Sequence, residues 1–165
     1  MAHQLHCAVN PTCGRETQYR VLPKAEEKKK CVVIGGGPSG MLAAQVLAKR
    51  GHDVVLFEKE KELGQKLYEI SNLSFKGDMR HYWKWDVETT KKCGAKIVLG
   101  TAATPELVMA ENPDAIFIAV GSSPIVPPIP GIERTAGILD VDNDRVEVGQ
   151  KVVVCGGGLS GTECA

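Results

Sequence analysis

The feature that most constrains the fold is the run "CVVIGGGPSGMLAA", in which three consecutive glycines separate two segments of different periodicity. Before them, Cys31 to Ile34 is a short apolar run, the pattern of a strand buried on both faces. After them, apolar residues recur at helical spacing until Gly51, and Asp53 to Glu58 predicts a second strand. Strand, helix and strand within about thirty residues form a right-handed βαβ unit, and hence a parallel sheet.

The glycines of this run have the spacing G-x-G-x-x-G, at Gly35, Gly37 and Gly40. We expect Gly35 to permit a tight turn and Gly40 to let helix and strand pack closely. Gly37 would admit the pyrophosphate of a dinucleotide to the helix N-terminus, where free N–H groups and the helix dipole favour an anion. Glu58 follows about twenty residues later, where an acid accepts hydrogen bonds from the adenine ribose. The sequence predicts a dinucleotide site here; a bare structural turn, with Glu58 as a solvated strand end, is the alternative.

The strand and helix pattern continues more loosely beyond Glu58. Proline recurs in residues 122–131 and predicts an irregular crossover, because proline lacks a backbone donor and fixes φ. The fold class is therefore α/β, a Rossmann-like parallel sheet that the sequence leaves truncated. The further elements that we expect are a helix over Met79 to Lys92, a strand over Lys96 to Leu99, a short helix over Thr104 to Glu111 and a strand over Asp114 to Gly121.

A second glycine turn closes the sequence in "KVVVCGGGLSGTECA", with Gly156, Gly158 and Gly161 at the same spacing as the first. Neither a further strand nor an acidic residue at the spacing of Glu58 follows it. Two such turns about 120 residues apart are typical of flavoproteins that bind a flavin dinucleotide first and a nicotinamide dinucleotide second. We therefore divide the chain into a lead-in and linker over 1–29, the first part of an FAD-binding domain over 30–150, and the truncated start of an NAD(P)H-binding domain over 151–165.

Composition excludes several classes of function. Twenty basic and twenty acidic residues cancel, which argues against nucleic acid or an anionic membrane as a partner. No apolar stretch approaches the roughly 20 residues of a membrane span. Six cysteines without secretory context predict reduced thiols in a cytoplasmic protein. No Cys-x-x-Cys pair is present, which argues against an internal zinc site and against a thioredoxin-reductase-like enzyme.

The sequence resembles the flavin and iron–sulfur ene-reductases, a family that includes 2,4-dienoyl-CoA reductase, 2-enoate reductase and the trimethylamine dehydrogenase relatives. Four segments carry the resemblance: "CAVNPTCGRE" resembles the region of the last cluster cysteine, "VVIGGGPSGMLAA" the FAD turn, "AVGSSPIVPPIPG" the crossover and "VGQKVVVCGGGLSGTECA" the start of the NAD(P)H domain. Departures occur where the family usually has Gly-Gly-Gln, since Gly64 matches but Gln65 and Lys66 do not. Val120 replaces the usual threonine of Ala-Thr-Gly.

The resemblance implies an electron path from NAD(P)H through FAD and a 4Fe–4S cluster to FMN in a TIM barrel, which reduces an activated carbon–carbon double bond. Cys7 would be one ligand of that cluster in the intact protein. The barrel and the other cluster cysteines are not found in the sequence, so we expect a fragment that is not catalytically complete alone. The alternative is a scaffold that binds ADP or FAD without redox work, because the trimethylamine dehydrogenase branch uses the corresponding site for ADP.

The residues expected to contact the cofactors follow from the glycine spacing together with the resemblance. No catalytic residue is assigned. For FAD they are Gly35, Gly37, Pro38, Ser39, Gly40, Glu58, Lys59, Gly64, Gln65, Ala119 and Gly121; for NAD(P)H in the intact protein they are Gly156, Gly158 and Gly161.

Other conspicuous residues have structural explanations. We expect Cys31 and Cys155 to be core residues on strands, because free cysteine packs as a small hydrophobe. Met79, Trp83 and Val87 recur at helical spacing and are expected to pack one helix face rather than to bind a cofactor.

The valines before the second glycine turn predict a strand, Val152 to Val154, without its native neighbours. An unpaired apolar strand is a template for pairing with any available edge. We therefore expect residues 151–165 not to form a working nicotinamide site, and instead to be disordered, to dock on the FAD-type sheet or to pair with another copy of the chain.

Overall fold

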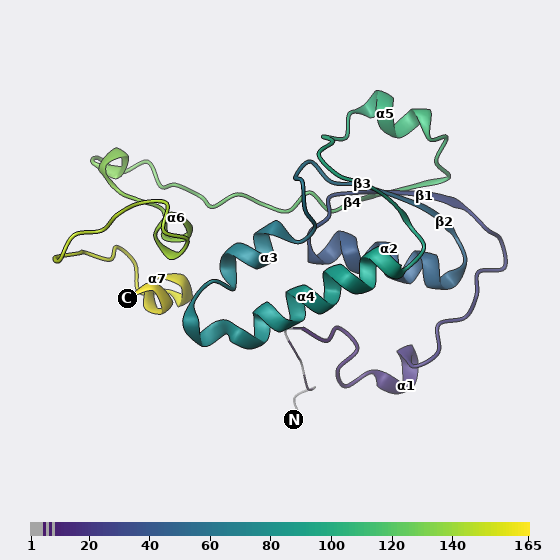
Figure 1. Cartoon of the computed structure of the whole chain (residues 1–165), viewed down its shortest axis with the longest axis horizontal. Helices are drawn as coiled ribbons and strands as arrows, with labels where there is room; N and C mark the ends of the chain where they lie inside the picture. Colours follow the sequence, from purple (N-terminus) through teal and green to yellow (C-terminus); the bar gives the residue numbers. More distant parts are fainter. Residues whose placement is uncertain (1–4, 6, 8) are drawn as a thin grey trace.

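The computed structural model describes residue 5, residue 7 and residues 9–165. In this part of the chain, parallel strands form a sheet in the order β3-β2-β1-β4, with helices on both faces (Figure 1). Val33 of β1 lies opposite Leu56 of β2 and Phe117 of β4. The strands are β1 (Lys30–Ile34), β2 (Asp53–Phe57), β3 (Lys96–Val98) and β4 (Ala115–Ile118). The predicted Rossmann-like α/β class is confirmed.

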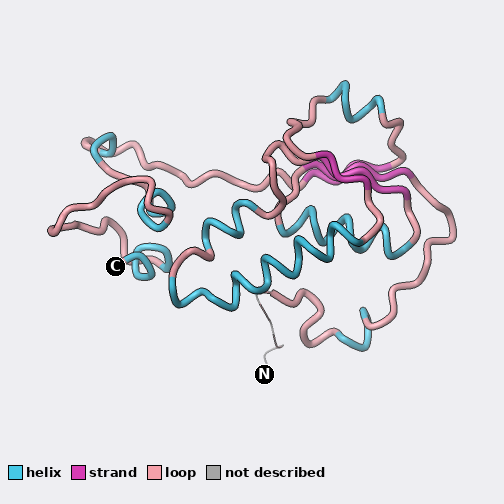
Figure 2. Tube along the Cα trace, in the orientation of Figure 1, coloured by secondary structure: helices cyan, strands magenta, loops and turns pink. Residues whose placement is uncertain are grey.

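The three helices predicted from the sequence, which end at Gly51 or cover Met79 to Lys92 and Thr104 to Glu111, are all present, and Figure 2 shows the long loops between the later helices. The α-helices are α1 (Glu16–Tyr19), α2 (Pro38–Arg50), α3 (Gln65–Ile70), α4 (Gly77–Lys92), α5 (Pro105–Ala110), α6 (Ile138–Asp142) and α7 (Leu159–Cys164), and short 3-10 helices cover Ser74–Lys76 and Ile132–Arg134. Among the described residues, no helix combines the length and the apolar composition that crossing a membrane requires.

The strands alternate their side chains between two apolar cores. Val33 and Leu56 are buried with Met41 of α2 on the face that α2 and α4 cover. Val32 and Val55 are buried on the opposite face, where Val108 of α5 packs against them. Each such side chain contributes about 1.5–3 kcal/mol on burial. The two-sided core explains why β1 and β2 are continuous apolar runs.

Helices α2 and α4 meet through an apolar contact and a buried polar cluster. Trp83 packs against the core and Val87 is buried in it, as expected, whereas Met79 is half-buried and is not part of this cluster. Beside them, Asp86 is 1% exposed; its Oδ1 accepts a hydrogen bond of 2.7 Å from Gln45 Nε2. Its Oδ2 has no hydrogen-bond partner among the described residues. Burial raises the pKa of Asp86, and the hydrogen bond from Gln45 offsets part of that rise.

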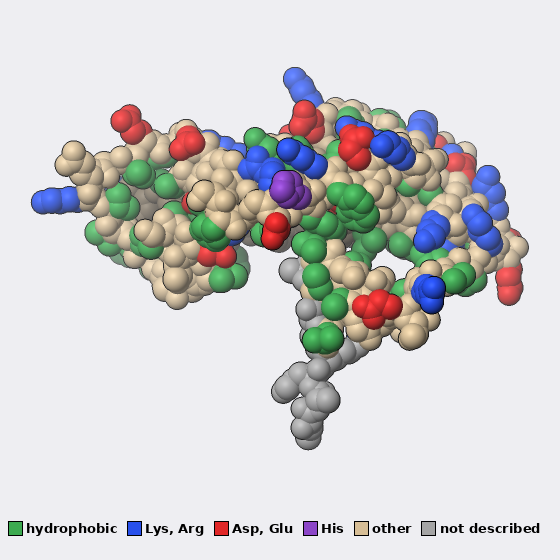
Figure 3. Space-filling view, turned by 60° about the horizontal axis from the view of Figure 1, so that its bottom comes forward, with side chains coloured by type: hydrophobic (Ala, Val, Ile, Leu, Met, Phe, Trp, Pro, Cys, Tyr) green, Lys and Arg blue, Asp and Glu red, His purple; other side chains and the backbone are tan. Residues whose placement is uncertain are grey.

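The C-terminal lobe, residues 132–164, lies apart from the sheet and packs against α3 (Figure 1). An irregular segment, residues 119–130, leads into it from β4, as the prolines predict. Figure 3 shows hydrophobic side chains on the surface of this lobe, at the left of the view. The boundary predicted at residue 150 falls inside the lobe and stays a prediction.

The strand predicted over Val152 to Val154 is wrong. These residues are irregular, and Val153 is 86% exposed. Cys155, expected in the core, is exposed, whereas Cys31 is buried on β1 as predicted. A strand forms only where a neighbour accepts its backbone hydrogen bonds, and none of the described residues lies beside this segment in a sheet.

Candidate dinucleotide site

Two glycines of the first turn are required by the fold itself. Gly35 has φ +104°, and a Cβ on it would lie 2.3 Å from the Ala119 carbonyl oxygen at the end of β4. A Cβ on Gly40 would lie 1.8 Å from the carbonyl oxygen of Gly35, because the first turn of α2 presses against the loop. Both distances are impossible for real carbon atoms, so these two glycines permit the close approach of strand, turn and helix.

Gly37 differs, because nothing in the described part of the chain requires glycine there. Its φ of −74° and ψ of −179° are open to any residue, and no described atom lies within 4 Å of a Cβ built on it. Gly37 caps the N-terminus of α2, so the space beside it faces the free N–H groups of the first helical turn. The arrangement leaves room for an anionic group where the backbone can bind it.

Glu58 closes the same turn from β2. Its Oε2 accepts a hydrogen bond of 2.5 Å from the Gly36 N–H, and its Oε1 accepts one of 2.8 Å from the Glu60 N–H. The side chain is buried, so its orientation is fixed by these two donors. Gly36 was not predicted from the sequence as a site residue. In the structure, a Cβ on it would lie 2.9 Å from Glu58 Oε2. Its place in an uninterrupted run of three glycines was the available signal.

The loop after β2 also reaches the turn. The Gly64 N–H donates a hydrogen bond of 2.8 Å to the Gly36 carbonyl, and a Cβ on Gly64 would lie 2.8 Å from the Trp83 ring. At the end of β4, the Ala119 N–H donates one of 2.8 Å to the Ile34 carbonyl. The structure thus brings Gly64 and Ala119 to the same edge as the glycine turn.

The remaining expected contacts are less closely grouped. Pro38, Ser39 and Gly121 are exposed, the first two at the start of α2 and the third three residues after β4. The Lys59 side chain is 74% exposed, and Gln65 lines a separate cavity of about 400 Å³ with Glu69 and neighbouring residues. Their contact with a cofactor stays a prediction.

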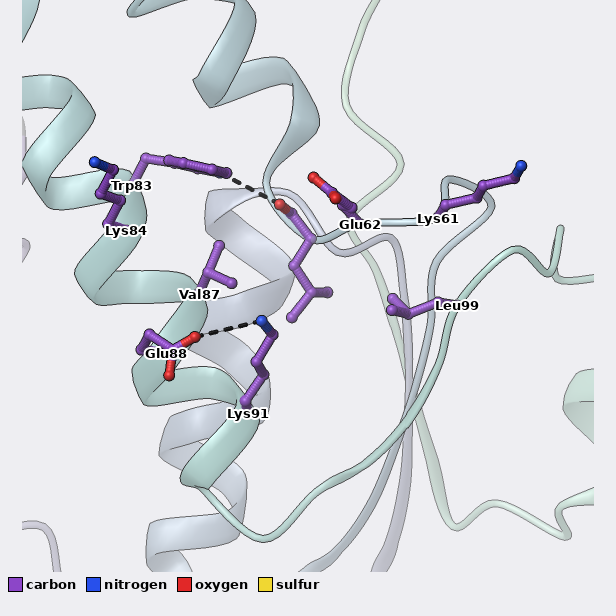
Figure 4. A pocket seen from close by; sticks show the side chains of 9 residues that line it. Lys61, Glu62, Trp83, Lys84, Val87, Glu88, Lys91 and Leu99 are labelled. Atoms are coloured by element: carbon purple, nitrogen blue, oxygen red, sulfur yellow. Dashed lines mark hydrogen bonds and ion pairs between the residues drawn. The ribbon is translucent and has the colours of Figure 1, made fainter.

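A larger cavity lies elsewhere. It has a volume of about 580 Å³ and lies between α4 and the loop after β2, with Leu63, Val87 and Leu99 among its lining (Figure 4). The Trp83 indole N–H donates a hydrogen bond of 3.3 Å to the Leu63 carbonyl at its edge. None of the residues predicted to bind a cofactor lines it, so the candidate site is the open turn and not this cavity.

The second glycine turn has nearly the same local shape as the first. Gly156 has φ +110°, and a Cβ on Gly161 would lie 2.1 Å from its carbonyl oxygen. Gly158, with φ −77° and ψ −177°, caps α7 and has open space beside it, as Gly37 does before α2. No strand precedes this turn and no acid faces it among the described residues, so the nucleotide role of these three glycines stays a prediction.

Cys7 is exposed, and no ligand set surrounds it among the described residues. In the part of the chain that the structure describes, no three His, Cys, Asp or Glu side chains are grouped to hold a metal ion. The role of Cys7 as a cluster ligand in the intact protein stays a prediction.

Comparison with known proteins identifies the family. Residues 29–165 match the family described as pyridine nucleotide-disulphide oxidoreductase. This chain belongs to that family. Its membership confirms that the chain is a flavin- and nicotinamide-dinucleotide-binding redox domain, with the first glycine turn at the start of the matched region.

Two similar proteins with known names are a reductase and an oxidase. The chain is 43% identical to cinnamate reductase of Clostridium sporogenes, over 96% of this chain and 24% of that protein. It is 39% identical to NADH oxidase of Thermoanaerobacter brockii, over 98% of this chain and 26% of that protein. Among solved structures, a 2-naphthoyl-CoA reductase complex is similar at 34% identity with a TM-score of 0.84, over 96% of this chain and 24% of that one. The resemblance to the ene-reductases is confirmed, and the chain spans about a quarter of the length of these relatives.

Proposed function

We propose that the chain is the FAD-binding segment of an NAD(P)H-dependent flavin and iron–sulfur oxidoreductase. The observation that carries the proposal is the open space at Gly37 beside a buried carboxylate, Glu58, on a turn whose other glycines are needed for packing. This combination suits a group with a pyrophosphate and a ribose.

The residues of the turn divide the binding of FAD between them. The N–H groups of Ser39 and Gly40 in the first turn of α2 would bind the pyrophosphate, because intrahelical hydrogen bonds begin with the Met41 N–H, which donates to the Gly37 carbonyl. Glu58 would accept hydrogen bonds from the adenine ribose, since each of its oxygens keeps a free lone pair beyond its backbone donor. FAD, when bound, accepts two electrons from a nicotinamide and releases them singly.

The remainder of the path lies outside these residues. We propose that electrons pass from NAD(P)H, bound at Gly156, Gly158 and Gly161 in the intact protein, through FAD and a 4Fe–4S cluster to an FMN barrel that reduces an activated carbon–carbon double bond. Cys7 would be one cluster ligand. The names of two similar proteins, cinnamate reductase and 2-naphthoyl-CoA reductase, support an unsaturated or aromatic acid derivative as the substrate. Free thiols at all six cysteines suit a cytoplasmic site of action.

The absorption spectrum of the purified chain tests the cofactor. We expect a yellow protein, or one that becomes yellow on addition of FAD, with a flavin band at about 450 nm that survives gel filtration. Denaturation should then release FAD in a near-stoichiometric amount, identified by mass spectrometry. A colourless protein that releases ADP would instead establish the scaffold without redox activity.

The exposed valines of the C-terminal lobe give a second, separate proposal. Val152, Val153 and Val154 are 58%, 86% and 41% exposed, and an unpaired apolar segment favours association with a second copy. Sedimentation velocity should show a dimer fraction that rises with concentration and that Val153→Asp removes. A monomer at every concentration would contradict this contact.

A further inference from the structure

The C-terminal lobe is fastened to the α3 region by a set of polar contacts between residues far apart in sequence. Asn72 Nδ2 donates a hydrogen bond of 2.9 Å to the Asp142 carbonyl, and Asn143 Nδ2 donates one of 3.2 Å to the Glu69 carbonyl. Arg145 Nη2 pairs with Glu69 Oε1. Glu69 therefore contacts the lobe with both its backbone and its side chain.

The Glu69 carboxylate is enclosed, and each of its oxygens has a cationic partner. Its side chain is 11% exposed; Oε1 binds Arg145, and Oε2 binds Lys66 Nζ at 3.0 Å. Burial by itself raises the pKa of Glu69, but the hydrogen bonds from Lys66 and Arg145 outweigh it, so the net pKa lies below its usual value. Arg145 is oriented in turn by Asp140 Oδ1 at 3.3 Å. Each partner of the Glu69–Arg145 ion pair therefore contacts one further charged group, Lys66 or Asp140.

Helix α3 connects this contact to the first glycine turn. Gly64 caps the N-terminus of α3 and donates its N–H to the Gly36 carbonyl at 2.8 Å, inside the predicted FAD site. Glu69 lies five residues further on, in the last turn of the same helix. One short helix therefore contacts the first glycine turn at one end and the lobe carrying the second glycine turn at the other.

We propose that Glu69 and Arg145 form a latch that fixes the orientation of the second glycine turn relative to the first. This inference rests on the proposed function, because electron transfer from a nicotinamide to a flavin requires the two dinucleotides to face each other reproducibly. Both are positioning residues, since neither is among the residues predicted to contact a cofactor. Lys76 Nζ also pairs with Glu163 Oε2 of α7 at 2.6 Å, and this second ion pair helps to hold α7 in place.

Hydrogen exchange followed by mass spectrometry tests the latch in the full chain. In Glu69→Gln and in Arg145→Gln, we expect amides of residues 138–164 to exchange about 5–30-fold faster, as loss of a coupled contact predicts for local opening. Amides of β1 and β2 should keep their wild-type rates. The double variant should exchange no faster than the faster single variant, because both changes break the same contact. Arg145→Lys should recover part of the protection.

The control is Glu88→Gln, which breaks exposed pairs of α4 with Lys91 and Lys92 and should change nothing in the lobe. Should Glu69→Gln fail to fold, the half-exposed Arg145 provides the same test through Arg145→Gln and Arg145→Lys. Unchanged exchange of the lobe, independent additive effects of the two substitutions, or equal acceleration in β1 and β2 would overturn the latch. The measurement contains no nucleotide, so a failure to bind FAD would count against the proposed function and leave this result intact.

Discussion

Gly37→Val is expected to lose dinucleotide binding while the chain keeps its fold. The backbone at Gly37 suits any residue, and no described atom lies within 4 Å of the new Cβ, so the substitution introduces no clash inside the protein. The branched side chain would instead fill the volume proposed for the pyrophosphate. We expect affinity for FAD to fall at least about a hundredfold, equivalent to roughly 2.8 kcal/mol. Equilibrium dialysis measures the affinity, and circular dichroism checks the fold.

The second glycine turn supplies a matched control. Gly158→Val makes the same substitution at a helix cap of nearly the same backbone conformation, with equally open space beside it. Any general cost of valine at a helix cap is therefore shared, and FAD affinity should stay at its wild-type value. Full FAD binding by Gly37→Val would place the site elsewhere. Equal losses in both variants would show that the effect is not local.

The Asp86→Asn variant is expected to be more stable than the wild type at neutral pH. A buried polar atom without a partner costs about 1–3 kcal/mol, and a charged one costs more. Asparagine keeps an Oδ1 for the hydrogen bond from Gln45 and carries no charge. We expect the free energy of unfolding to rise by an amount within that range.

The pH dependence of this difference identifies its cause. Burial raises the folded-state pKa of Asp86 above the unfolded value of about 3.9. The folded chain then binds the proton more tightly, so this group stabilises the fold at low pH. Its contribution falls as the pH rises from the unfolded pKa to the folded one. In urea unfolding from pH 4.5 to 8, the advantage of Asp86→Asn should grow with pH and then level off, while Glu88→Gln gains nothing. A constant difference across the range would assign the gain to packing.

The central sheet was predictable because its signals are local. β1 and β2 are apolar runs buried on both faces, and the glycine turn between β1 and α2 allows few alternatives. Gly35 and Gly40 were correctly expected at the turn for packing, and the structure supplies the reason in the carbonyl oxygens that they approach. Glu58 was placed by its spacing alone, and it lies against the same turn.

The features that sequence reasoning missed depend on distant partners. The valines before the second turn have strong strand propensity, yet propensity is overridden where no neighbouring strand accepts their hydrogen bonds. The contact of Glu69 with Arg145 joins residues 76 positions apart, and neither residue belongs to a periodic pattern. Asp86 is a charged residue, and the sequence alone gives no sign that it is buried. Its burial follows from the packing of α2 on α4.

The near-identity of the two glycine turns bears on how such a binding element is encoded. Among the described residues no strand lies beside the second turn, so its shape follows from a few consecutive residues and their own steric limits. Sheet pairing is then needed to bury and orient the turn, but not to form it. A short segment is therefore enough to carry this backbone shape, proposed here to bind an anion, into a new sequence context. What surrounds each copy can diverge afterwards and decide which nucleotide it accepts.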